Sequence, residues 1–417
     1  MPNNRAIAFV LFFGFLAAAS PAFAGSSYNV LFSFCMHNNC SNGMLSASGV
    51  IFDSDGNLYG TTEGGGQLGY GEIFELTPTG GTWKESVLYS FTNQDDGQWP
   101  VGDLAMDNSG NLYGTAHAGG GTSFCGTVFE LIHYNGKWSQ KTLHRFKCNK
   151  TDGNLPSGVI LDANGNLYGT TWLGGTYQNG AVFELIPNGS SWTERVIHNF
   201  NGRNGAVPTG LVLDSARNLY GTTSEGGSSG CYHNGCGLVY ELTPNNSKWT
   251  EKVLHIFEPE GKTGLGPLAG LIFDKGGNLY ATTSGGGTYH RGTVFELTRN
   301  HGKWTEKVLY SFKGDRDGRE PTASLSFDAA GNLYSTTAEG GLHNYYLPEG
   351  AGTVFELSPG TNGSWTERIL YKFLPSGFHG TTPEGDLHLD AAGNLYGTAS
   401  FGGNGGGVIF KITHSVH

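Results

Sequence analysis

The feature that most constrains the fold is a short motif, Asp-x-x-Gly-Asn-Leu-Tyr, that returns seven times along the chain. Its Asn-Leu-Tyr part begins at Asn57, Asn111, Asn166, Asn218, Asn278, Asn332 and Asn394, and an Asp lies four residues earlier in every copy. The Gly is present in all copies except one, where Arg217 replaces it. A repeat of this length indicates an architecture built from one supersecondary unit per copy.

The fifth copy illustrates what one unit contains. Four segments rich in β-branched and aromatic residues, 269–274, 278–283, 292–297 and 304–312, are separated by Gly, Asn and Asp. This composition is typical of strands joined by turns, and no stretch after residue 24 shows the 3.6-residue apolar period of a helix. We name the strands A, B, C and D. The Asp-x-x-Gly-Asn link predicts a tight A–B hairpin, and a Glu on strand C is expected to pair with a Lys or Arg on strand D.

Four antiparallel strands in about 50 residues are typical of a β-propeller blade. Segment 27–34 resembles a D strand that no A, B or C precedes, and the last copy, 385–412, provides A, B and C without a D. Together they complete a seventh blade, and a ring sealed in this way has no open sheet edge. We therefore predict an all-β fold, a single seven-bladed β-propeller domain over residues 25–417. Its blades are four-stranded and antiparallel, and the N-terminal strand completes the last blade.

The complete consensus of one unit is more specific than the hairpin motif alone. It continues from Asn-Leu-Tyr-Gly-Thr-Thr to Gly-Thr-Val-Phe-Glu-Leu-Thr-Pro and then to Trp-Thr-Glu-x-Val-Leu-Tyr-Ser-Phe. This pattern resembles the GloVer tandem-repeat family of exported bacterial proteins over nearly the whole chain after residue 24, and the hairpin alone also resembles NHL-type propeller repeats. The resemblance implies a propeller fold and export, and it implies no particular activity.

The first 24 residues have the pattern of a signal peptide. Arg5 precedes an apolar run over residues 6–19, and Ala22-Phe23-Ala24 fits a cleavage site. We expect the mature chain to begin at Gly25 and to be secreted or periplasmic.

Six cysteines in an exported chain indicate disulfides. The expected pairs are Cys35–Cys40, Cys231–Cys236 and Cys125–Cys148, with free thiols as the alternative. Their spacing does not fit a zinc pattern.

The chain carries a formal net charge of -11, which argues against nucleic acid and anionic membrane surfaces as partners. Beyond residue 24, no apolar run is long enough to span a membrane. The Asp-Gly and Asn-Gly steps between D and A strands are interpreted as turns rather than calcium sites. We expect no cofactor, no metal site and a monomer.

Departures from the repeat identify candidate site residues. Strand A lines the channel of a propeller, and there most copies have Gly or an aliphatic residue where Asp103, Asp386 and His388 stand. A carboxylate that orients a His forms a general-base pair, which makes these three residues catalytic candidates. The alternative is a solvated channel mouth with packing variation.

The long and variable B–C and D–A loops share one face, where function is expected. Aromatic and imidazole side chains are frequent there: Trp99, Trp172, Tyr289, His290, His343, Tyr345 and Tyr346. Flat rings beside polar groups suit sugars or peptide loops, although they also serve to cover neighbouring blades. We expect a binding scaffold for a glycan or protein ligand, with an extracellular hydrolase or lyase at the channel mouth as the alternative. Convergence of the three channel candidates would favour the enzyme, and divergence would favour binding.

Overall fold

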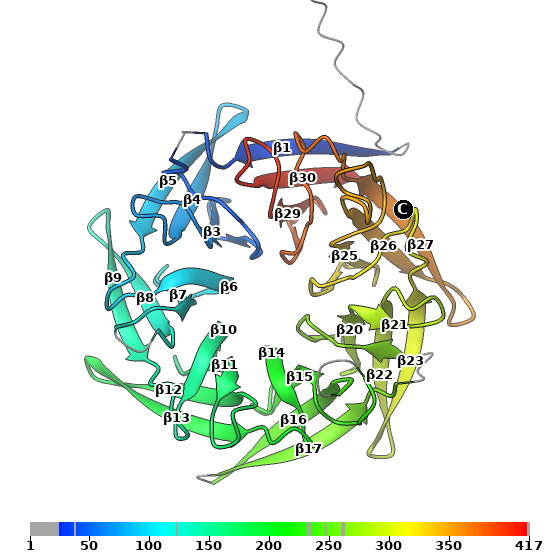
Figure 1. Ribbon diagram of the computed structural model, residues 1–417, viewed down its shortest axis with the longest axis horizontal. Helices are drawn as coiled ribbons and strands as arrows, with labels where there is room; N and C mark the ends of the chain where they lie inside the picture. The colour runs from blue at the N-terminus through cyan, green and yellow to red at the C-terminus, as the bar shows by residue number, and fades with distance from the viewer. Residues whose placement is uncertain are drawn as a thin grey trace, which may run out of the picture.

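The computed structural model describes residues 25–414, except 37–38, 122–123, 232–234, 247 and 260–262. The predicted signal peptide lies outside these residues. Seven four-stranded antiparallel sheets are arranged as blades around a central axis, which confirms the predicted propeller (Figure 1). Within the described residues, all regular secondary structure consists of β-strands.

Each blade runs from strand A at the channel to strand D at the rim. The A strands are β2 (Ile51–Phe52), β6 (Gln98–Met106), β10 (Gly153–Leu161), β14 (Ala206–Leu213), β19 (Ile272–Phe273), β24 (Ser326–Phe327) and β28 (His388–Leu389). The B strands are β3 (Leu58–Thr62), β7 (Leu112–Ala118), β11 (Leu167–Gly174), β15 (Leu219–Glu225), β20 (Leu279–Thr283), β25 (Leu333–Thr337) and β29 (Leu395–Ala399).

The outer half of each blade is longer and more uniform. The C strands are β4 (Glu72–Thr79), β8 (Thr127–Tyr134), β12 (Ala181–Asn188), β16 (Leu238–Asn245), β22 (Thr293–Asn300), β26 (Thr353–Pro359) and β30 (Val408–His414). The D strands are β5 (Thr82–Ser90), β9 (Lys137–Arg145), β13 (Ser191–Asn199), β17 (Lys248–Ile256), β23 (Lys303–Ser311), β27 (Trp365–Lys372) and β1 (Ser26–Ser33). A small additional pair, β18 (Gly264–Leu265) and β21 (Gly285–Gly286), lies in the loops of blade 5.

The N-terminal strand closes the ring. β1 pairs antiparallel with β30, so that the two ends of the described chain form the outer half of blade 7 (Figure 1). Tyr28 of β1 also stacks on Tyr371 of blade 6, with ring centroids 3.8 Å apart. The closure therefore combines a strand ladder with an aromatic contact to the preceding blade.

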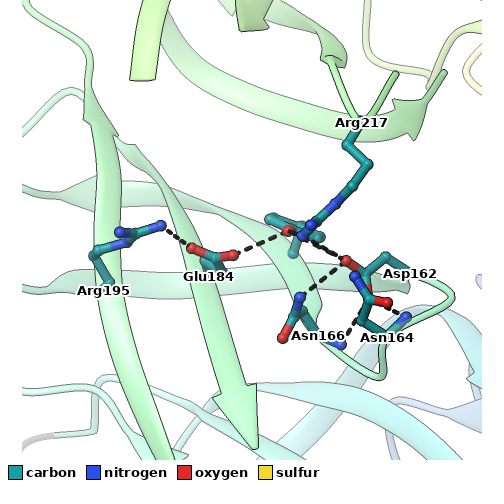
Figure 2. Close-up of polar contacts among 7 residues, drawn as sticks. Asp162, Asn164, Asn166, Glu184, Arg195 and Arg217 are labelled. Atoms are coloured by element: carbon teal, nitrogen blue, oxygen red, sulfur yellow. Dashed lines mark hydrogen bonds and ion pairs between the residues drawn. The ribbon is translucent and has the colours of Figure 1, made fainter. Parts of the chain in front are cut away.

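The Asp of the repeat holds the A–B hairpin. In blade 3, Asp162 Oδ1 accepts hydrogen bonds from the backbone N–H groups of Asn164 and Asn166, both at 2.9 Å (Figure 2). The Tyr168 hydroxyl lies 3.4 Å from Asp162 Oδ2 and 2.9 Å from Glu184 Oε1. The motif thus ties the turn to strand C, which explains why Asp, Asn and Tyr recur together.

Two arginines extend this network in blade 3. Arg195 on strand D donates to Glu184 on strand C, which is the cross-strand pair that the sequence predicts (Figure 2). Arg217, which replaces the turn Gly in blade 4, reaches back to blade 3 and donates to Asp162 Oδ2 at 2.8 Å. The exception in the repeat therefore links two blades.

The apolar core lies between neighbouring blades. Strand C alternates between the two sides of its blade because successive side chains on a strand point in opposite directions. In blade 2, buried Val128 belongs to a cluster with Phe183 of blade 3, whereas buried Phe129 belongs to a cluster with Ile73 of blade 1. Each blade thus contributes to two interfaces.

The segment that enters each blade, either the D–A loop or the start of strand A, is bonded to the preceding blade on the loop face. One backbone N–H group per blade donates to a carbonyl of the preceding blade at 2.8–3.1 Å, from Leu45, Trp99, Leu155, Val207, Gly266, Glu320 and Thr382. These seven hydrogen bonds fix the position of the loops around the channel mouth.

All three predicted disulfides are formed. The Cα–Cα distances are 3.9 Å for Cys35–Cys40, 5.5 Å for Cys125–Cys148 and 5.2 Å for Cys231–Cys236. Disulfides are typical of extracytoplasmic proteins. None of the described residues forms a helix of the length and apolarity that crossing a membrane requires.

Candidate functional site

A cavity of about 460 Å³ lies in the central channel, and all seven blades contribute to its wall. Blades 3, 4 and 5 present glycine backbone and aliphatic side chains, including Gly158, Ile160 and Ile272. Blades 7, 1 and 2 instead present polar side chains, which are Glu384, Asp386, His388, Glu63 and Asp103. The channel therefore has one apolar wall and one wall rich in carboxylates.

The three catalytic candidates from the sequence converge on this polar wall. His388 Nε2 of blade 7 lies 3.4 Å from Asp103 Oδ2 of blade 2, across blade 1. Asp386 lies two residues before His388 on the same blade, and its Oδ1 accepts a hydrogen bond from the backbone N–H of Ser324 at 2.6 Å. The side chains of His388 and Asp103 are 34% and 31% exposed, so a ligand in the channel reaches both.

Gly49 of blade 1 makes this approach possible. Its backbone N–H donates to Asp103 Oδ1 at 2.7 Å. A Cβ at this position would lie 2.9 Å from both carboxylate oxygens of Asp103, which is closer than van der Waals contact allows. The Gly of the repeat is therefore required here for the carboxylate to cross blade 1 and meet His388.

Burial and neighbouring charges shift the proton affinities of these groups. Burial and the negative charge of Asp103 raise the pKa of Asp386. The hydrogen bonds from Ser324 and the charge of His388 lower it by less, so the net pKa is raised. Burial lowers the pKa of His388, but the hydrogen bond and charge of Asp103 and the charge of Asp386 outweigh it, and the net pKa is raised. A carboxyl and an imidazole that both hold protons more tightly than usual form an acid–base set.

A second pair of carboxylates lies beside this set. Burial and the charge of Glu384 raise the pKa of Glu63. Glu384 is itself held by Ser400, whose hydroxyl donates to Glu384 Oε2 at 2.8 Å. The polar wall therefore continues with negative side chains from blades 7 and 1.

The aromatic residues of the loop face fall into two groups on opposite sides of the ring. Trp99 of blade 2 and Trp172 of blade 3 are 46% and 42% exposed. The ladder between β6 and β7 pairs Gln98 with Ala118 and Pro100 with Ala116, so the backbone of Trp99 runs beside that of His117. The His117 ring lies 4.7 Å from that of Trp172. His117 Nδ1 is 3.1 Å from the Pro156 carbonyl, and burial lowers the His117 pKa. Trp99, His117 and Trp172 therefore lie on two neighbouring blades of the loop face, with both tryptophans exposed and a ring contact between His117 and Trp172, and we call them the aromatic ledge.

The other expected ligand-binding residues lie on blades 5 and 6. Tyr289 is half-exposed in the B–C loop of blade 5, next to His290. Tyr345 and Tyr346 are almost fully exposed in the B–C loop of blade 6, near His343, and their rings meet edge to face at 5.5 Å. Among the described residues, these side chains lie on other blades than the aromatic ledge, so the seven expected ligand-binding residues do not form one continuous patch.

Asp103, Asp386 and His388 are recognisable in the sequence as departures from the repeat, but the sequence does not predict that Asp103 pairs with His388. That contact depends on ring closure, which brings blade 7 next to blade 1. The role of His117 in the aromatic ledge is likewise not evident from the sequence, although His117 stands near the end of β7 where three other copies have Ser.

The fold and the repeat define a seven-bladed propeller protein with disulfides. More specifically, the chain belongs to the Gloeobacter/Verrucomicrobia repeat family, whose model matches residues 20–234 and 229–417. The resemblance noted from the repeat motifs is thereby confirmed. A search of curated proteins finds no match.

Solved propeller structures resemble this fold at low sequence identity. A protein from Lactobacillus plantarum has a TM-score of 0.53 and 16% identity, with 82% of this chain and 88% of that chain covered. A hypothetical selenium-binding protein from Sulfolobus tokodaii has a TM-score of 0.52 and 13% identity, with 76% of each chain covered. The gluconolactonase XC5397 from Xanthomonas campestris has a TM-score of 0.44 and 16% identity, with 78% and 89% covered. At these identities the likeness shows the fold alone.

Proposed function

We propose that the protein is exported and binds a glycan at the channel mouth, on the face formed by the B–C and D–A loops. The observation that carries this proposal is the exposed aromatic ledge of Trp99, His117 and Trp172 on the same face as a carboxylate-lined channel. Flat aromatic rings pack against the apolar faces of sugar rings, and carboxylates accept hydrogen bonds from sugar hydroxyls.

The charge of the channel narrows the class of glycan. The polar wall presents Glu63, Asp103, Glu384 and Asp386, and the chain has a formal net charge of -11. A glycan rich in carboxylate or sulfate groups would be repelled by this wall. The ligand that fits is therefore a neutral glycan or one that carries amino groups.

The test is a glycan array followed by calorimetry with the best ligand. Replacing Trp172 with Ala should weaken binding by about 1–3 kcal/mol, because buried aromatic anchors dominate interfaces of this kind. The matched control is Tyr134→Ala, an exposed aromatic on the opposite face at the C–D turn of blade 2, which should leave the affinity unchanged. Equal losses in both variants, or a protein ligand in place of any glycan, would contradict the proposal.

A second candidate function is an extracellular hydrolase or lyase at the same channel mouth. The observation that favours it is the convergence of His388, Asp103 and Asp386, which satisfies the geometric requirement for an acid–base site. In this case His388 exchanges a proton with the bound substrate, and Asp103 orients the imidazole through Nε2. Both carboxylates also bridge blades through backbone N–H groups, so a structural role is the competing explanation.

The two functions predict opposite results for the same variants. If the protein only binds the glycan, Asp386→Asn and His388→Gln should leave affinity nearly unchanged and no product should form. If the protein is an enzyme, incubation with the array ligand should yield product, and either substitution should abolish turnover while binding survives. Chromatography of the glycan after incubation, run in parallel with calorimetry, distinguishes the two.

A further inference from the structure

Neighbouring blades are joined at the rim by a recurring group of three side chains. One comes from strand D of a blade, one from the following D–A loop, and one from strand D of the next blade. Between blades 3 and 4 these are His198, Asn204 and Glu251. Asn204 Nδ2 lies 3.1 Å from His198 Nε2 and 2.8 Å from Glu251 Oε2. The amide thus donates to both neighbours and connects the three side chains, although Glu251 Oε1 is left buried without a hydrogen-bond partner.

The junction between blades 2 and 3 has a different chemistry at the same positions. There the group is His144 on β9, Asp152 in the D–A loop and Glu194 on β13. His144 Nε2 lies 3.3 Å from both oxygens of Asp152. One ligand atom of each residue lies within 4.8 Å of the other two, and within the described residues this is the only such group of His, Cys or carboxylate side chains.

Asp in place of Asn removes the donor that connects the group. Asp152 and Glu194 are both acceptors when ionised, so they repel each other where Asn204 and Glu251 attract. Glu194 Oε1 is shielded from solvent and has no hydrogen-bond partner, as is also true of Glu251 Oε1 at the other junction. At this junction, however, Asp152 cannot supply the amide donor that Asn204 gives to Glu251 Oε2. A cation between the two carboxylates would satisfy both of them.

The Asp152 side chain is already oriented for this role. Only 4% of it is exposed. Its Oδ1 accepts a hydrogen bond from the Gly153 backbone N–H at 2.7 Å, and its Oδ2 accepts one from the Lys147 backbone N–H at 3.2 Å. Such outer hydrogen bonds fix the direction of a ligating carboxylate and leave its remaining lone pairs available.

We propose that His144, Asp152 and Glu194 bind a divalent transition-metal ion of the Zn²⁺ class and so connect blades 2 and 3 at the rim. One imidazole nitrogen and two carboxylate oxygens suit Zn²⁺, whereas Ca²⁺ and Mg²⁺ prefer ligand sets made of oxygen only. Three protein ligands leave the fourth position to water. The site is separate from the channel, and it departs from the sequence-based expectation of no metal.

The ring provides matched variants for the test. Asp152→Asn converts this junction to the chemistry of the junction between blades 3 and 4, and Asn204→Asp makes the reverse change. Untagged protein stripped with EDTA is titrated with ZnCl₂ by calorimetry. Wild type should bind one Zn²⁺, and Asp152→Asn should lower the Zn²⁺ affinity more than about 100-fold. Loss of a residue that only hydrogen-bonds to a metal ligand costs about 10–100-fold, so a larger loss indicates that Asp152 is itself a ligand. Asn204→Asp should add a second site.

Two further measurements keep the result unambiguous. In EDTA, Asp152→Asn should melt at least as high as wild type, because the Asn can donate to both neighbours, and this shows that lost binding is not lost folding. Co²⁺ in place of Zn²⁺ should give visible absorption bands in wild type but not in Asp152→Asn. Equal Zn²⁺ affinity in wild type and Asp152→Asn, or binding of Ca²⁺ in preference to Zn²⁺, would overturn the proposal.

Discussion

At the scale of single residues, the positions that depart from the repeat carry the unusual chemistry. Glu72 begins strand C of blade 1, where blades 2, 5 and 6 have Thr127, Thr293 and Thr353. It is completely buried, and neither of its carboxylate oxygens has a hydrogen-bond donor. The nearest ionisable neighbour is Glu85. Burial and the charge of Glu85 raise the pKa of Glu72, and burial also raises the pKa of Glu85.

We predict that Glu72→Gln stabilises the protein increasingly as the pH rises. The folded pKa of Glu72 lies above that of the unfolded chain, so the folded state holds a proton that the unfolded state has released. Stability is therefore lost as the pH rises above the ordinary glutamate value, by about 1.4 kcal/mol per pH unit until the folded pKa is reached. Gln cannot ionise, so the variant avoids this loss.

Thermal melts of wild type and Glu72→Gln at pH 4, 6 and 8 check this expectation. The two should melt at similar temperatures at pH 4, and the variant should melt higher at pH 8. Glu258→Gln serves as a control, because the Glu258 side chain is exposed and its removal leaves the buried carboxylates in place. A constant difference between Glu72→Gln and wild type across the pH range would show that Glu72 does not titrate as expected.

At the scale of elements, the repeat motifs predict the B, C and D strands well, because each of the three keeps a similar burial pattern from blade to blade. The five residues Leu58–Thr62 of a B strand are all buried, a C strand such as β4 is buried at its start and exposed at its end, and a D strand such as β5 alternates. Strand A is less regular than predicted. In blades 1, 5, 6 and 7 it contains only two residues in the ladder, and in blades 2, 3 and 4 the register shifts near its middle. In blades 2 and 3 this irregular part contains Gly102 and Gly158, where the two backbones approach closely, and a local sequence pattern contains no information on that approach. The contact between Asp103 and His388 is unpredictable for the same reason, because this contact depends on which blades lie next to one another in the ring.

We predict unequal contributions from the three disulfides. Cys125–Cys148 closes a loop with a sequence separation of 23, whereas Cys35–Cys40 and Cys231–Cys236 have a separation of 5. The entropy that a cross-link removes from the unfolded chain grows with the logarithm of loop length, which favours the longer loop by about 1 kcal/mol. Cys125 is also buried in the interface between blades 2 and 3.

Double Cys→Ala variants at each pair, unfolded with urea, provide the measurement. Removal of Cys125–Cys148 should lower the free energy of unfolding by the largest amount. The other two variants act as controls for the loss of a cross-link as such. If removal of Cys35–Cys40 or Cys231–Cys236 lowers the free energy of unfolding more than removal of Cys125–Cys148, the stabilisation by these disulfides does not follow the entropy of loop closure.

At the scale of the whole molecule, ring closure gives all seven blades four strands and joins the two ends of the described chain in one sheet. Among the strands of the described residues, β1 alone is not contiguous in sequence with its blade, and it pairs with β30. Without β1, β30 would present a row of unpaired backbone groups, and blade 6 would lose the stacking of Tyr28 on Tyr371. Exposed edges of this kind recruit strands from other chains. Closure therefore affects both stability and association.

We predict that deletion of residues 25–33, with Cys35 and Cys40 retained, lowers the melting temperature and produces dimers or larger species. Tyr28 and Phe32 of β1 are packed against the core, and each buried aromatic contributes about 1.5–3 kcal/mol. Size-exclusion chromatography with light scattering and thermal melts measure the two effects. A synthetic peptide with the sequence of residues 25–34 should bind the truncated protein, restore the monomer and raise the melting temperature, whereas a peptide with the same residues in scrambled order should not. A truncated chain that stays monomeric and melts like wild type would show that the six complete blades and the remaining three strands close the ring by themselves.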